Sequence, residues 1–290
     1  MRLVTFAPKG AAPRLGALTQ DAVIDISAAL APLARDMIGL LRAGARGLER
    51  AQRALEAADR SLRHDAQAVA LLAPLPAPGK ILGVGRNYRA HAAEGGLAAQ
   101  ENPRIFVKLA SAVIGTGAAI PKPAAVRKLD YETELAVVIG RRARGVAESE
   151  ALAHVGGYTI LNDVSARELQ FDVSPPQTSF AKSMDGFCPM GPCLATPDEL
   201  ADIGNIRLRG SVNGELVQDG NTRDLIFPIP RLIAYLSSYL TLEPGDVIAT
   251  GTPAGVGAFR KPPRYLAPGD VVRMEIEGIG VLENRVRAAD

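Results

Sequence analysis

The chain has no tryptophan, few other aromatic residues and almost no net charge. Its 33 basic and 31 acidic residues leave a charge of +2, too small for the electrostatic footprint of a nucleic-acid-binding protein. It also lacks an uninterrupted apolar run of about 18 residues, the length that spans a bilayer. The start, MRLVTFAPKGAAPRLG, contains no apolar signal core. We therefore expect a cytoplasmic protein that binds neither nucleic acid nor membranes.

Cysteine is equally scarce, with two residues in a chain of 290. Cys188 and Cys193 lie in the segment Cys-Pro-Met-Gly-Pro-Cys, whose spacing differs from the CxxC of zinc and redox sites. A disulfide framework is excluded. With 47% hydrophobic residues the chain can still build a packed core, in which we expect both cysteines to be reduced and buried.

The first 73 residues differ in texture from the rest of the chain. They contain strand patterns followed by helix patterns, and Gly44 and Gly47 interrupt the helical segment. The predicted strands are 2–6, 14–18 and 22–26, and the predicted helices are 36–43 and 48–62. Prolines at positions 74, 76 and 78 favour an extended connector. We predict a small N-terminal α/β domain (1–73), a connector (74–79) and a main domain (80–290).

Strands predominate in the main domain. The predicted strands are 80–84, 104–109, 132–139, 157–161, 206–212, 246–250 and 271–276, and the predicted helices are 148–154 and 230–240. Strands and helices do not alternate regularly, which argues against a doubly wound parallel sheet. The predicted fold class is α+β and mostly β.

Two glycine-rich segments resemble nucleotide-binding loops but lack residues that those loops need. In Gly83-Val84-Gly85-Arg86-Asn87-Tyr88, tyrosine stands where a dinucleotide fingerprint requires its third glycine. Segment 250–257 lacks the Lys-Ser/Thr ending of a P-loop and is typical of a tight turn. A dinucleotide-dependent oxidoreductase is therefore a weak alternative.

Three carboxylates lie where strand patterns begin and end. Glu132 and Glu134 stand two apart at the start of a strand, so their side chains project from one face. Asp163 follows the apolar segment 158–161, from which it can reach the same point. Without clustered histidine or cysteine, such a set favours Mg²⁺, Mn²⁺ or Ca²⁺ over zinc. A solvent-facing acidic strand is the alternative for the two glutamates.

Two further patterns suggest catalysis. His91 and Glu94 have the spacing that places both on one face of a helical turn, where a carboxylate can raise the basicity of an imidazole. A surface ion pair is the alternative. Lys182 stands among apolar and small residues, so it could be buried and stabilise an enolate or oxyanion. The alternative interpretation of Lys182 is a surface lysine whose aliphatic chain covers apolar residues while its ammonium group is exposed to solvent.

These motifs, in this order, resemble the fumarylacetoacetate hydrolase family. The resemblance extends over residues 80–286, whereas residues 1–73 match only loosely. The matching segments are Gly85-Arg86-Asn87-Tyr88 with His91-x-x-Glu94, Phe106-Val107-Lys108, Asp130-Tyr131-Glu132-x-Glu134, Asn162-Asp163-Val164-Ser165-Ala166-Arg167, Lys182-Ser183-x-Asp185 and Thr250-Gly251-Thr252-Pro253-x-Gly255-Val256-Gly257.

The resemblance implies a mixed β-sandwich roll for the main domain and a homodimer. It implies that Glu132, Glu134 and Asp163 bind Mg²⁺ or Mn²⁺, with Ca²⁺ as an alternative. It implies that His91 and Glu94 form a dyad that prepares water, and that Lys182 stabilises developing charge. The residues implied to contact substrate are Arg86, Tyr88, Lys108, Arg167, Gln170 and Thr252. The segment 91–100 resembles a lid that folds over the site.

The activity implied by the resemblance is divalent-metal-dependent hydrolysis of a C–C bond in a β-diketo acid. An acylpyruvate, fumarylpyruvate or diketo-deoxy-sugar acid would be the substrate, and segments 218–222 and 257–266 are similar to the sugar-acid branch. The alternative is a decarboxylase or isomerase of an oxo-diacid such as oxaloacetate, because both reactions need the same stabilised enolate. A non-catalytic metal-binding scaffold would be expected to lack His91, Glu94 or Lys182, and all three are present.

Overall fold

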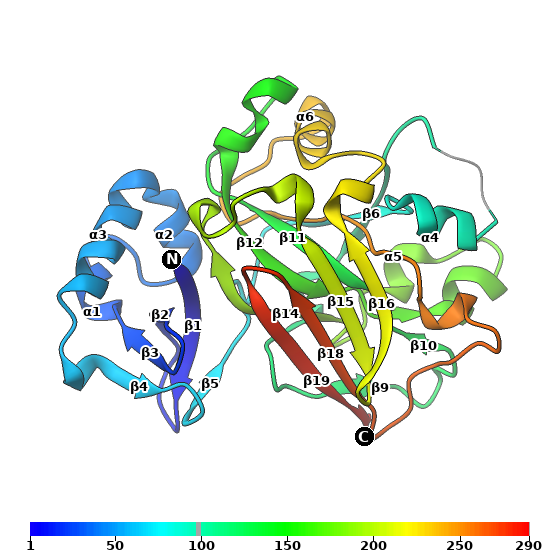
Figure 1. Cartoon of the computed structure of the whole chain (residues 1–290), viewed down its shortest axis with the longest axis horizontal. Helices are drawn as coiled ribbons and strands as arrows, with labels where there is room; N and C mark the ends of the chain where they lie inside the picture. The colour runs from blue at the N-terminus through cyan, green and yellow to red at the C-terminus, as the bar shows by residue number, and fades with distance from the viewer. Residues whose placement is uncertain (97–99, 290) are drawn as a thin grey trace.

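The computed structural model describes residues 1–96 and 100–289. Its largest sheet has 12 strands, ten of them in the order β4-β3-β2-β1-β14-β12-β11-β17-β6-β7, with β5 beside β1 and β8 beside β14 (Figure 1). These strands are β1 (Arg2–Pro8), β2 (Arg14–Leu18), β3 (Ala22–Asp25), β4 (Arg63–Asp65), β5 (Val69–Leu71), β6 (Ile81–Gly85), β7 (Arg104–Lys108), β8 (Val113–Ile114), β11 (Thr133–Ile139), β12 (Val155–Asn162), β14 (Cys188–Ala195) and β17 (Val247–Ala249).

A five-stranded sheet packs on β11, β12 and β14 of the large sheet. Its order is β16 (Glu215–Asn221), β15 (Arg207–Val212), β18 (Val271–Ile276), β19 (Gly280–Ala288) and β9 (Ile120–Lys122). A short pair is formed by β10 (Leu129–Asp130) and β13 (Ser165–Ala166). The prediction of an α+β fold dominated by strands is therefore confirmed.

Helices are few and short. They are α1 (Ser27–Leu30), α2 (Met37–Arg42), α3 (Gly44–Glu56), α4 (Arg89–Glu94), α5 (Thr178–Ala181) and α6 (Ile229–Tyr239), with 3₁₀ segments that include η3 (Glu148–His154) and η8 (Gly257–Phe259) and one π-type turn, η4 (Glu168–Asp172). The predicted helix at 230–240 is confirmed as α6, and the one at 148–154 is a 3₁₀ helix. None of the helices in the described ranges has the length and hydropathy needed to cross a bilayer.

The N-terminal strands are confirmed, whereas the helix after them differs from its prediction. Helix α3 runs through Gly47 instead of starting after it, and residues 60–65 form a 3₁₀ turn and β4. A Cβ on Gly47 would lie 2.9 Å from the Leu40 carbonyl oxygen, so this glycine allows α3 to approach α2 closely. Gly47, which was predicted to interrupt the helix, therefore permits close packing of two helices.

The N-terminal segment shares its sheet with the rest of the chain. Strand β1 pairs antiparallel with β14, and the Thr5 hydroxyl donates a hydrogen bond to the Pro74 carbonyl. One apolar cluster combines Leu3 from β1 with Val138 and Leu161 from β11 and β12. The division of the chain at residues 73 and 74 into two domains stays a prediction.

The middle of the large sheet is apolar on both faces. Every residue of β11 is buried, and its side chains alternate between two cores, with Leu135 and Val137 in one and Ala136 and Val138 in the other. Cys193 and Cys188 are both free and buried in β14, as predicted. The end of the β11–β12 pair at which Thr133 faces Asn162 lies on the same side of the molecule as α4, α5 and β10, away from α1–α3 (Figure 1).

Candidate active site

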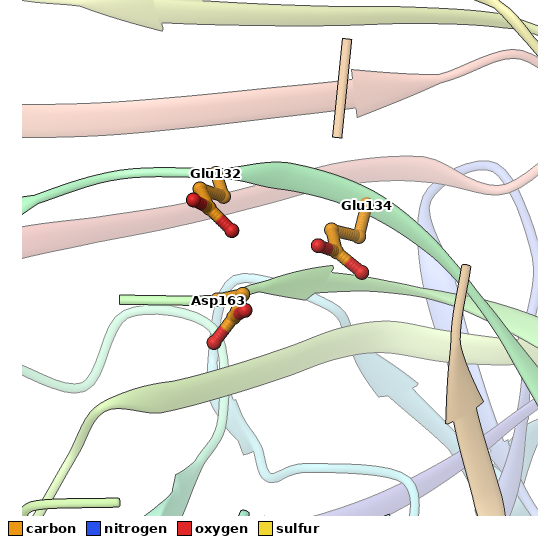
Figure 2. A group of neighbouring side chains, drawn as sticks. All are labelled: Glu132, Glu134 and Asp163. Atoms are coloured by element: carbon orange, nitrogen blue, oxygen red, sulfur yellow. The ribbon is translucent and has the colours of Figure 1, made fainter. Parts of the chain in front are cut away.

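Three buried carboxylates converge at the end of the β11–β12 pair (Figure 2). Glu132 directly precedes β11, Glu134 is its second residue, and Asp163 directly follows β12. One ligand atom from each lies within 4.8 Å of the others. The strand register explains the convergence, because Thr133 pairs with Asn162 and the Asn162 side chain accepts the Glu132 N–H at 3.2 Å. The predicted grouping is confirmed, and the solvent-facing alternative is excluded.

Lysine side chains neutralise part of this acidic group. Lys182 Nζ lies 2.9 Å from Glu132 Oε2 and 2.6 Å from Asp163 Oδ2, and it donates to the Ser165 hydroxyl at 2.7 Å. Burial alone would lower the pKa of Lys182, but the carboxylates of Asp163 and Glu132 outweigh burial and raise it. Lys182 is 2% exposed, so the prediction of a buried lysine is confirmed. Lys108 Nζ pairs with Asp163 Oδ1 at 2.7 Å.

Glu134 differs from its two neighbours because no cationic side chain in the described ranges pairs with it. Its carboxylate accepts the Gly251 N–H at 2.9 Å. Burial and the adjacent carboxylates of Asp163 and Glu132 hold its pKa well above the usual value. The group therefore has an excess of buried negative charge and offers only oxygen ligands. These residues fit a hard divalent cation such as Mg²⁺ or Mn²⁺.

Helix α4 brings the predicted dyad to the same site. His91 Nδ1 lies 2.8 Å from Glu94 Oε1, and Glu94 Oε2 accepts the Gly255 N–H at 3.0 Å. The His91 ring is 7% exposed and lies 5.8 Å from the ring of Phe259 in η8. The pair thus joins a buried imidazole to a carboxylate on a residue exposed at the surface. Part of the predicted lid, residues 97–99, lies outside the described residues, and its α4 part contacts the segment at Gly255.

One cavity of about 470 Å³ contains most of the predicted site residues. Its lining includes Arg86, His91, Glu132, Glu134, Arg167, Gln170, Lys182 and Thr252. Glu94 and Asp163 are not part of this lining, but they contact His91 and Lys182, which are. Thr252 donates to the Thr133 carbonyl at 3.0 Å and accepts a hydrogen bond from Gln218.

Two residues predicted to contact substrate lie outside the lining. Tyr88 is 1% exposed in the apolar core, and its hydroxyl has no hydrogen-bond partner within residues 1–96 and 100–289. Burial and the carboxylate of Glu134 raise its pKa. Lys108 lies beneath the cavity, where it bonds to Asp163 and to the Lys182 carbonyl. In this structure both residues lie outside the cavity lining, and their contact with substrate stays a prediction.

Arg167 is the guanidinium closest to the acidic group. Its Nε donates to Asp130 Oδ2 at 2.8 Å, its Nη1 donates to Gln170 Oε1 at 2.8 Å, and its Nη2 lies 2.7 Å from Glu132 Oε1. Burial would lower the pKa of Arg167, but Asp130 and Glu132 outweigh burial and raise it. Sequence reasoning did not assign a role to Asp130, although its place two residues before Glu132 gives the same strand-face spacing.

Strand β7 contributes two lining residues that sequence reasoning missed, Arg104 and Phe106. The Phe106 ring lies 5.0 Å from Lys182 Nζ, a cation–π distance. A Cβ on Gly83 would overlap with the Phe106 ring, because β6 and β7 pair these two residues. The first glycine of the dinucleotide-like segment therefore makes room for an active-site ring.

Comparison with known proteins agrees with this geometry. The family model "Fumarylacetoacetate (FAA) hydrolase C-terminal" matches residues 80–287. The chain is 43% identical over 289 residues to the mitochondrial oxaloacetate tautomerase FAHD2A of Homo sapiens, covering 99% of this chain and 91% of that protein. A maleylpyruvate hydrolase from Sphingobium sp. SYK-6, solved with manganese (II) ion and pyruvate, superposes with a TM-score of 0.84 at 33% identity over the full length of both chains. A 5-carboxymethyl-2-hydroxymuconate delta-isomerase from Mycobacterium smegmatis gives a TM-score of 0.78 at 35% identity, again over both full chains.

Proposed function

The chain belongs to the fumarylacetoacetate hydrolase family, and from this premise we propose that it interconverts the keto and enol forms of a small 2-oxo acid, with oxaloacetate as the first candidate. The observation that carries the proposal is that a carboxylate triad, a buried lysine and a histidine–glutamate dyad meet at one cavity. The sequence prediction put C–C hydrolysis first. The relatives named oxaloacetate tautomerase support its alternative at least as well.

In this proposal Glu132, Glu134 and Asp163 hold a divalent cation, Mg²⁺ or Mn²⁺, which when bound polarises the oxygens of the acid. The ammonium of Lys182 is fixed by hydrogen bonds and adds positive charge at the same wall of the cavity. It favours the enolate over the keto form, because only the enolate carries a negative oxygen at this point. Arg167, held by Asp130, orients the carboxylate of the acid.

The dyad moves the proton. Because His91 Nδ1 faces Glu94, the other ring nitrogen, Nε2, is the atom left to exchange a proton with a bound acid. It takes the proton from the carbon next to the 2-oxo group and delivers it to the enolate oxygen; in the reverse direction it takes the enol O–H proton and delivers it to that carbon. Glu94 stabilises the imidazolium that forms between these events. The hydrogen bond from Gly255 keeps Glu94 in place.

Hydrolysis of a diketo acid is the second candidate, and the solved maleylpyruvate hydrolase favours it. In that reaction His91 Nε2 would take its proton from water, and the resulting hydroxide would attack the distal carbonyl. The bond between that carbonyl and the neighbouring carbon would then break, giving one carboxylic acid and the enolate of the other acid, which takes the proton back from His91. Both reactions use the same residues. They differ in whether water is consumed and in whether a second acid is released.

The test uses the Mn²⁺-loaded protein and follows the enol absorbance of oxaloacetate and, separately, of acetylpyruvate. Mass spectrometry identifies the products, and EDTA serves as the control. Accelerated loss of oxaloacetate enol without a change in mass supports the tautomerase. Pyruvate plus acetate from acetylpyruvate supports the hydrolase, and CO₂ release from oxaloacetate supports a decarboxylase. No EDTA-sensitive change with either acid contradicts the proposal.

The cytoplasmic location and the homodimer are also proposals. The human relative is named as mitochondrial, so the location needs its own experiment. Val107 and Leu109, at the end of the edge strand β7, and Phe180 in the adjoining α5 are 48%, 56% and 61% exposed, which supports a covered face in an assembly. Light scattering on the purified protein gives the mass in solution, and a monomer would contradict the homodimer.

A further inference from the structure

Two guanidinium groups line the cavity without an acidic partner. Arg86 and Arg104 both belong to its lining, and neither makes an ion pair with any residue in 1–96 or 100–289. The cations at the triad are different, since Lys108, Lys182 and Arg167 each pair with a carboxylate. The cavity thus has an acidic side, where every cation is paired with a carboxylate, and a side with two arginines that have no acidic partner in the described ranges.

The pairing of β6 with β7 places these arginines together. Arg104 stands opposite Gly85, and its stem lies over that glycine, with Cδ 3.8 Å from the position of a Cβ. Arg86 follows Gly85 directly and lines the same cavity. Burial and the charge of Arg104 lower the pKa of Arg86. An anion bound between the two groups would remove this repulsion.

The backbone of Arg86 is strained, and its neighbour maintains the strain. Its φ of +60° lies in the left-handed region, which is uncommon for a residue with a long side chain. The Asn87 amide donates to the carbonyls of Thr250 and Phe227 at 2.8 and 3.0 Å, and its oxygen accepts the Phe227 N–H at 2.8 Å. Such over-determined strain is common where a side chain must be aimed at a ligand.

We propose that Arg86 and Arg104 bind a second carboxylate of the substrate, so that the enzyme selects dicarboxylic over monocarboxylic 2-oxo acids. The planar guanidinium group can bind a carboxylate through two parallel hydrogen bonds. A site with two guanidinium groups therefore favours an anionic ligand over a neutral one. This inference rests on the proposed function for the identity of the first, 2-oxo acid end of the substrate.

The experiment measures binding and therefore does not require turnover. Calorimetric titration of the Mn²⁺-loaded protein compares 2-oxoglutarate with 2-oxopentanoate, which has the same chain length and one carboxylate fewer. We expect the wild type to bind the diacid at least about tenfold more tightly, the effect of one charge-assisted hydrogen bond. Arg104→Gln and Arg86→Asn should each reduce this preference to below about threefold. Asparagine is chosen because it tolerates a positive φ.

A matched control and the turnover assay complete the design. Arg231 is an exposed arginine of α6 with no ion pair in the described ranges, and Arg231→Gln should keep the wild-type preference. Mn²⁺ affinity and circular dichroism check that each variant is folded. Equal binding of the two acids by the wild type, no binding of the diacid, or a preference that survives in either arginine variant overturns the proposal. An intact preference without tautomerase or hydrolase turnover would instead overturn the proposed function.

Discussion

Asp130→Asn tests how strongly a buried ion pair stabilises this site. Asp130 is fully buried, and its Oδ2 accepts Arg167 Nε at 2.8 Å and the Ala258 N–H at 2.9 Å. Its Oδ1 accepts the N–H groups of Gly257 and Tyr131 at 2.8 and 2.9 Å. Asparagine has one oxygen and an NH₂ group, so at least two of these donors lose their acceptor. Arg167 also loses one of its two buried carboxylate partners and keeps Glu132; breaking a buried ion pair costs about 3–5 kcal/mol.

Urea unfolding followed by far-ultraviolet circular dichroism measures this loss, since the chain has no tryptophan. With an m-value of about 3 kcal/mol/M, the midpoint should fall by about 1 M or more. The control is Glu215→Gln, which removes an exposed carboxylate paired with Arg260 and Arg264 and should leave the midpoint close to that of the wild type. A midpoint for Asp130→Asn no lower than that of the control would refute the reasoning.

Three further predictions concern the metal site, the dyad and the N-terminal segment. Glu132→Ala should abolish Mn²⁺ binding and turnover together, as measured by calorimetry and the enol assay; normal activity would remove Glu132 from the ligand set. Glu94→Gln should lower kcat by about 10² or more at unchanged Mn²⁺ affinity, because it weakens the base and keeps every metal ligand; unchanged kcat would contradict the dyad. Burial alone would raise the pKa of Asp25, but hydrogen bonds from Ser27 and Arg14 outweigh it and lower the pKa below its usual 3.8. The stability lost in Asp25→Asn should therefore be full above pH 3.8 and should vanish as the pH falls through the lowered folded pKa, which urea midpoints across pH can check; a difference that grows on acidification would contradict the sign.

The triad could be predicted because it depends on local geometry. Alternation along one strand sets the direction of Glu132 and Glu134, and a carboxylate at the end of the neighbouring strand needs only the antiparallel register to reach them. The dyad depends on helical spacing within one turn, which is also local. Their positions therefore follow from short segments of sequence.

Residues whose role depends on distant packing were harder to place. The motif that contains Arg86 also contains Tyr88. Arg86 lines the cavity, whereas Tyr88 is buried in the apolar core against Leu225. The union of β1 with β14 has the same origin, because it joins residues nearly 200 positions apart. In β14, prolines at 189 and 192 concealed a fully buried strand, since proline cannot donate to a sheet ladder.

The residue pattern of strand β7 contains a signal from which Arg104 and Phe106 could have been predicted as site residues. Arg104, Phe106 and Lys108 share one face, while Ile105 and Val107 share the other, and Val107 is 48% exposed. On the first face Phe106 and Lys108 are buried and Arg104 is exposed, whereas on the second face Ile105 packs against the apolar core, so charge occurs on the face that borders the cavity. Lys108 contacts Asp163 and Phe106 contacts Lys182. The same alternation then requires Arg104 to face the site, which is why a residue at the start of an edge strand is expected to determine the choice of substrate.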